Sequence, residues 1–209
     1  MVEIIFLLIL AGFFAWGTAL ENQQQRISNE MVRLHVVANS DSEEDQALKL
    51  EVRDAVLAAA IPLVEQAKDV TEAKRRIEEN LTVLEAAAEE TLHGLGQKQN
   101  VTVCLNRELF GTRHYAGFSL PGGYYDALRV TIGEGGGKNW WCVVYPQICM
   151  ASTTEQQEAV AVMAGMTEED VAIIQAESEE YELKFKTLEI FENILTWFRS
   201  RGKGIPTSR

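Results

Sequence analysis

Cysteine and histidine are the residues of this 209-residue chain that could support nucleophilic chemistry, and it holds three of each. A thiol nucleophile requires a nearby base that removes its proton. Cys104, Cys142 or Cys149 could act with His35 or His114 in this way, so an exported thiol hydrolase is one possible function. No surrounding motif supplies a group to orient such a base. The sequence therefore predicts no catalytic residues and a protein that is not an enzyme.

The histidines also bear on metal binding, because zinc sites combine His, Cys and carboxylate ligands at short, regular spacings. His35, His93 and His114 lie far apart in the chain, and no two of them are at ligand spacing. We expect no metal and no cofactor.

Cys142 and Cys149 have a spacing that suits a disulfide. Six residues separate them, and Pro146 among these lets the chain turn back. In an exported protein such a pair is expected to be oxidised. A closed loop of this size would stabilise the fold by roughly 2.5 kcal/mol in the chain-entropy model.

A glycine-rich stretch from Gly133 to Lys138 could cradle a phosphate. Its spacing is one residue short of the P-loop pattern, and Asn139 stands where Ser or Thr would hold magnesium. We interpret this stretch as a flexible hairpin loop between two strands.

Acidic residues cluster at positions 41, 43, 44 and 45 and could form an acid and base couple. They also follow serines at the spacing of a capping box, with Ser40 before Glu43 and Ser42 before Asp45. Acidic side chains are favoured in the first turn of a helix. We interpret the cluster as the start of a helix.

The elements around these residues alternate between two hydrophobic periods. A strand over 33–38 precedes an amphipathic helix that ends near Pro62, and a second helix runs from Asp69 to about Gly94. Strands are predicted over 101–105, 128–132, 140–145 and 181–186, followed by a final helix through Phe198. The fold class is α+β: one domain with an early strand, two amphipathic helices, an antiparallel sheet and a C-terminal helix.

An apolar segment precedes this domain. Residues 4–20 carry no charge and would span ~25 Å as a helix, slightly less than a ~30 Å bilayer core. Small residues at Gly17 and Ala19 would allow cleavage after Ala19, although the only early charge, Glu3, is acidic. We expect a signal peptide or membrane anchor over 1–20, a polar linker over 21–30, the α+β domain over 31–200 and a flexible basic tail over 201–209.

The charge balance limits the partners. The chain has 19 basic and 31 acidic residues, a formal net charge of −12. Nucleic-acid binding is not expected, because phosphate contacts require clustered Lys and Arg. General adhesion to anionic lipid is not expected either, so membrane contact should be limited to residues 4–20.

Three stretches within residues 30–150 together form a specific pattern. The first runs from Arg33 to Ser42, with Asp45 to Leu50 and Val52 to Asp54. The second is Leu120 to Tyr124, and the third is Ala127 to Val130 and Gly133, with Lys138 to Val143 and Cys149. Together they resemble the stage II sporulation protein R family of endospore-forming bacteria. The resemblance implies a signal protein secreted from the forespore into the intermembrane space, or anchored at the membrane facing it. There it would activate a membrane-embedded aspartic protease that processes the precursor of sigma factor E in the mother cell.

Two adjacent tryptophans suggest where such a partner would bind. Trp140 and Trp141 lie in one predicted strand, so their rings should point to opposite faces and one can remain available to a partner. The alternative is that the protein's own helices cover both. We expect a partner-binding surface formed by Asn39, Ser40, Asp41, Asp45, Lys138, Asn139, Trp140 and Trp141. A structural or envelope-adhesion protein is the remaining alternative.

Overall fold

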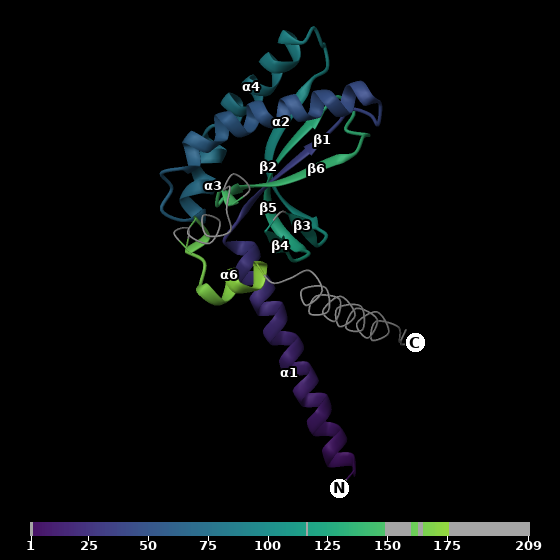
Figure 1. The fold of residues 1–209 in the computed structure, drawn as a ribbon, viewed down its shortest axis with the longest axis vertical. Helices are drawn as coiled ribbons and strands as arrows, with labels where there is room; N and C mark the ends of the chain where they lie inside the picture. The colour runs from purple at the N-terminus through teal and green to yellow at the C-terminus, as the bar shows by residue number, and fades with distance from the viewer. Residues whose placement is uncertain (1, 116, 149–159, 163–164, 176–209) are drawn as a thin grey trace, which may run out of the picture.

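The computed structural model describes residues 2–115, 117–148, 160–162 and 165–175 (Figure 1). In chain order the elements are α1 (Val2–Asn29), β1 (Val32–Val37), α2 (Glu43–Val64), α3 (Val70–Glu79), α4 (Leu81–Gly94), β2 (Val101–Phe110), β3 (Arg113–Tyr115), β4 (Phe118–Leu120), β5 (Gly123–Ile132), β6 (Asn139–Tyr145) and α6 (Glu168–Ile174). This arrangement confirms the predicted α+β class.

The main sheet has four strands in the order β2-β5-β1-β6. β2 and β6 pair antiparallel to their neighbours, whereas β1 and β5 run parallel. β1 therefore lies between β5 and β6, and all six of its residues are buried. The loop from Gly133 to Lys138 connects strands that are not neighbours, so the hairpin predicted there is wrong. It passes over the end of β1 instead.

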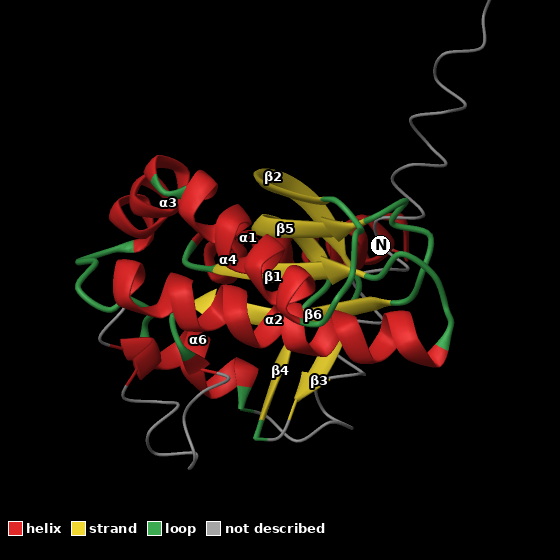
Figure 2. Cartoon of the chain, turned by 90° about the horizontal axis from the view of Figure 1, so that it is seen from above, coloured by secondary structure: helices red, strands yellow, loops and turns green. Residues whose placement is uncertain are grey.

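Helices α2, α3 and α4 cover one face of the sheet (Figures 1 and 2). Ser42 caps α2 by accepting from the backbone N–H of Asp45, and Asp69 caps α3 by accepting from that of Glu72. Both caps follow the predicted pattern. Asn80 separates α3 from α4 within the stretch predicted as one helix, and Ile77, Leu84 and other apolar side chains on either side of this break still share one core.

A second core lies against the other face of the sheet. It combines the end of α1, the β3–β4 hairpin and α6, through side chains such as Ile27, Met31, Leu120 and Ile174. Both faces are thus covered, and β1 contributes side chains to each.

Helix α1 projects from the domain (Figure 1). Ile4, Leu7 and Leu8 are exposed, whereas Ile27 near its end is fully buried. Gln23 donates to Glu169 at 3.2 Å. Residues 21–29, expected to form a linker, are thus the last turns of α1 and part of the domain.

Among the described residues, no helix is both long enough and apolar enough to cross a membrane. The signal peptide or anchor over residues 1–20 stays a prediction. Cys149, the strand over 181–186, the final helix and the tail over 201–209 lie outside the described residues.

Replacing Ile27 with Ala in the full-length chain should lower the free energy of unfolding by about 2–5 kcal/mol, because it leaves a cavity between α1 and the sheet. Gln25→Ala, on the exposed side of the same turn, should change it by less than about 0.5 kcal/mol. Urea unfolding of both variants measures the difference. Equal effects would show that residues 21–29 do not belong to the folded domain.

Candidate functional site

The residues predicted to bind a partner lie where two loops meet. The turn after β1 contacts the loop before β6 through backbone and side-chain hydrogen bonds. Asn39 accepts at its carbonyl from the N–H of Gly136 (3.1 Å) and at Oδ1 from that of Glu134 (3.0 Å). Asp41 Oδ1 accepts from the N–H of Lys138 at 2.7 Å. We call residues 39–42 and 133–138 the loop pair.

The glycines of the loop pair allow the two loops to approach closely, and they do not form a phosphate site. Each backbone N–H from Gly133 to Lys138 donates to an acceptor within the protein, which leaves none of them to cradle an anion. Gly133 has φ +55°, and a Cβ there would collide with the side chain of Asn39. A Cβ on Gly137 would collide with the carbonyl of Ser40. The loop predicted to be flexible is therefore tied to the end of β1.

Asp45 holds the turn together from inside. Its carboxylate accepts from Asn39 Nδ2 (3.0 Å), Ser40 Oγ (2.5 Å) and Gln99 Nε2 (2.8 Å). The hydrogen bond from Ser40, followed by that from Gln99, lowers the pKa of Asp45 below its usual range. This carboxylate has a structural role. That role agrees with the interpretation of the acidic cluster as a helix start and does not favour an acid and base couple.

Of the five remaining residues of the predicted surface, all but Trp141 are exposed. Asp41, Lys138 and Asn139 lie at the surface of the loop pair and the start of β6. Trp140 is 38 % exposed, and the guanidinium of Arg53 on α2 lies 4.5 Å from the centre of its ring. The structure thus separates the predicted set into an inner group, Asn39, Ser40 and Asp45, and an outer group, Asp41, Lys138, Asn139 and Trp140.

Trp141 points to the opposite face, as the alternation of a strand predicts. Its ring stacks on His35 with centroids 3.9 Å apart. His35 Nδ1 lies 2.6 Å from Glu108 Oε2, and Nε2 lies 3.0 Å from Asn139 Oδ1. Glu108 Oε1 also accepts from Arg129 at 3.2 Å. This network joins all strands of the main sheet, and Glu108 and Arg129 had no signal in the sequence.

Arg33 lies two residues before His35 on the same face and is fully buried. Its guanidinium lies 4.3 Å from the ring centre of Phe110 and 4.9 Å from that of Tyr125. Nη2 donates to the hydroxyl of Tyr115, whereas Nε and Nη1 have no hydrogen-bond partner in the described part of the chain. Burial raises the pKa of Tyr125, so it stays a neutral phenol. Cation–π contacts of about 2 kcal/mol offset part of the several kcal/mol that burial of a charge costs.

The thiol-hydrolase alternative receives no support from the described thiols. Burial raises the pKa of Cys104, whereas a reactive thiol needs a lowered one. Both nitrogens of His35 face Glu108 and Asn139. His114 Nδ1 lies 2.8 Å from Ser119 Oγ. Among the described residues, no group of three His, Cys, Asp or Glu side chains is placed to hold a metal.

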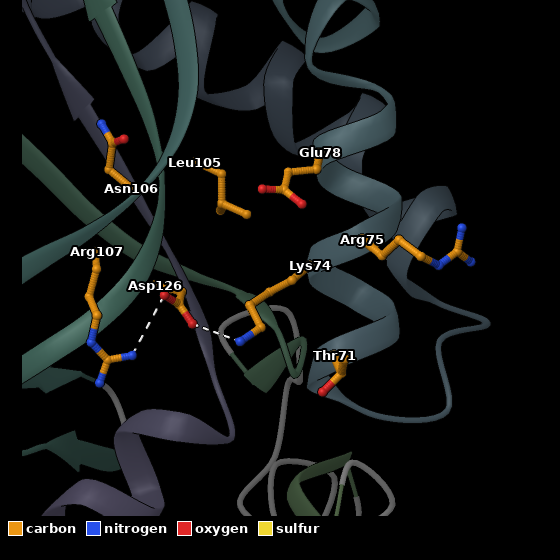
Figure 3. A pocket seen from close by; sticks show the side chains of 8 residues that line it. All are labelled: Thr71, Lys74, Arg75, Glu78, Leu105, Asn106, Arg107 and Asp126. Atoms are coloured by element: carbon orange, nitrogen blue, oxygen red, sulfur yellow. Dashed lines mark hydrogen bonds and ion pairs between the residues drawn. The ribbon is translucent and has the colours of Figure 1, made fainter.

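An open cleft of about 390 Å³ lies between α3 and strands β2 and β5 (Figure 3). Asp126 at its centre pairs with Lys74 at 2.9 Å and with Arg107 at 3.7 Å. The lining side chains carry charges of both signs, since Glu78 and Asp126 stand beside Lys74, Arg75 and Arg107.

Comparison with known proteins decides the family. A sequence profile described as stage II sporulation protein R matches residues 28–155. The chain belongs to the stage II sporulation protein R family. It is 35% identical over 185 residues to "Stage II sporulation protein R" of Bacillus subtilis (strain 168), which covers 84% of this chain and 83% of that protein. No solved structure matches. The profile spans the loop pair, the His35 network and Arg33, so the family resemblance and the sporulation role that it implies are confirmed.

Replacing Gly133 with Ala should destabilise the fold by about 1–3 kcal/mol, because Ala is strained at this φ and its Cβ would push Asn39 away. Gly94→Ala is the matched control: its Cβ meets nothing within 4 Å, so stability should be unchanged or rise by up to about 1 kcal/mol. Urea unfolding compares the two. If both variants are as stable as the wild type, the loop pair is not rigidly joined.

Proposed function

We propose that this chain is an exported sporulation signal that activates a membrane-embedded aspartic protease, which then processes the precursor of sigma factor E in the mother cell. Residues 4–20 would serve as signal peptide or anchor and make the only membrane contact. The protein would act in the intermembrane space, secreted from the forespore or held at the membrane facing it. Membership of the stage II sporulation protein R family is the observation that carries this proposal.

The environments of the candidate histidine and cysteine side chains favour a ligand over an enzyme. His35 is held between Glu108 and Asn139, and the pKa of Cys104 is shifted away from reactivity. The net charge of −12 argues against nucleic acid as the partner. We therefore propose a protein as the binding partner.

We assign partner contact to the outer group, Asp41, Lys138, Asn139 and Trp140. Binding is favoured when the contact surface is already ordered, because less conformational entropy is lost. The inner group supplies this order through Asp45 and its hydrogen bonds. Tryptophan is enriched at the energetic centres of interfaces, so Trp140 should contribute most. Trp141 would act indirectly, by packing on His35.

Co-expression of the chain with the protease and the sigma precursor in a non-sporulating host tests the function. The wild-type chain should trigger cleavage of the precursor. Trp140→Ala should weaken activation by roughly tenfold or more, the loss typical of an interface hot spot. Val83→Ala, an exposed apolar position on α4, is the control and should have no effect.

The two assignments fail in different ways in that experiment. If the wild-type chain triggers no cleavage, the proposed activation is wrong. If wild type and Trp140→Ala trigger it equally, and both unfold at the same urea concentration, activation stands but the outer group is not the contact surface.

We also propose the disulfide between Cys142 and Cys149, which an exported protein would favour. Cys142 lies buried on β6, and Cys149 follows it closely in the chain. In urea without reductant, an alkylating reagent should modify Cys104 but neither of the other two. After reduction all three should react, as mass spectrometry would measure. Modification of Cys142 before reduction would exclude the disulfide and reopen the thiol alternative.

A further inference from the structure

The buried guanidinium of Arg33 forms no ion pair with any described residue. On its own face of the sheet, its direct neighbours in the register are Ala127 on β5 and Val143 on β6, both apolar and buried. A buried Arg normally pairs with a carboxylate, because an unpaired charge in a low-dielectric interior is strongly unfavourable. At this position the adjacent strands supply none.

Glu108 on β2 contacts His35, the next residue of β1 on the face that carries Arg33, and both of its oxygens are already engaged. Its Oε2 contacts His35 and its Oε1 contacts Arg129. The described ion pairs of Glu108 therefore do not include Arg33. Among the described residues, the one hydrogen bond of the Arg33 guanidinium goes to the hydroxyl of Tyr115, which carries no negative charge to balance it.

The geometry of the guanidinium leaves room for a better acceptor. Nε and Nη2 share one edge of the planar group, the edge that binds the two oxygens of a carboxylate in bidentate pairs. Among the described residues, Nε has no hydrogen-bond partner, and Nη2 has the Tyr115 hydroxyl alone. Tyr115 is half-buried and belongs to β3, which pairs with β4 in a small sheet apart from the main one. It is the least buried of the three aromatic side chains around the guanidinium, so a ligand would have to enter by displacing it.

We propose that Arg33 is a binding site for a carboxylate group of another molecule, which replaces the Tyr115 hydroxyl at Nη2 and pairs with the free Nε. A single negative charge matches the single guanidinium. A phosphate dianion would leave an uncompensated charge between the rings of Phe110 and Tyr125. The carboxylate can come from an acidic residue of a polypeptide or from a small organic acid. This site is independent of the proposed protease partner.

The Nε–H signal of Arg33 in the full-length protein, labelled with 15N-arginine, reports on the site directly. Titration with sodium acetate at pH 7 and constant ionic strength should shift this signal until it saturates, while sodium chloride should not. The blocked peptide acetyl-Gly-Asp-Gly-amide and its Asn counterpart test the polypeptide source. Saturation with the Asp peptide supports a polypeptide ligand, and saturation with acetate alone supports a small organic acid.

Two variants complete the test. Arg33→Lys identifies the signal by its loss. Tyr115→Phe removes the competing hydroxyl and should strengthen acetate binding by about 3- to 10-fold, the effect of one hydrogen bond. The proposal is overturned if the wild-type signal responds to neither acetate nor peptide, if chloride shifts it equally, or if inorganic phosphate binds more tightly than acetate. The three titrations that could overturn the proposal are made on the wild-type protein.

Discussion

The burial of β1 between β5 and β6 is the constraint on which the rest of this structure depends. A strand hydrogen-bonded along both edges satisfies its backbone groups only within the sheet, and all six residues of β1 are buried. Its parallel pairing with β5 requires a long connection, and α2, α3 and α4 lie within that connection. β6 can reach the far edge of β1 only if the chain crosses over the end of β1. The glycines and the loop pair follow from that crossing.

The same burial determines the chemistry of the second face. Alternation along β1 places Leu34 and Val36 under the helices, and Arg33 and His35 on the opposite side. His35 meets hydrogen-bonding partners from β2 and β6, so its polarity is satisfied. Arg33 is held by aromatic rings and one hydroxyl, with two nitrogens left over. These two polar residues of β1 differ because the main sheet supplies polar side chains beside His35, from β2 and β6, whereas the register neighbours of Arg33 are apolar.

In the loop pair, the side chains that hold the backbone in place are different from those that lie at the surface. Residues that are close in type and sequence have different tasks: Asp45 is enclosed by donors, whereas Asp41 lies at the surface. Trp140 and Trp141 differ in the same way, one beside Arg53 on α2 and the other stacked on His35. For the signalling ligand proposed above this division would be favourable, since the exposed side chains are presented by a backbone that is already fixed. The family profile covers both parts.

The sequence alone determined the α+β class, the helix starts at Ser42 and Asp69, most strand positions and the opposite orientation of the two tryptophans. Each depends on periodicity or capping within a few residues of the chain. It could not predict the strand order, the crossing of the glycine loop, the contact of Glu108 with His35 or the isolation of Arg33. Those features depend on pairings between residues distant in sequence, and the local sequence patterns are compatible with several alternative strand pairings. Only the tertiary structure decided them, because they depend on which strand lies beside β1 and therefore on which side chains its neighbours place next to it.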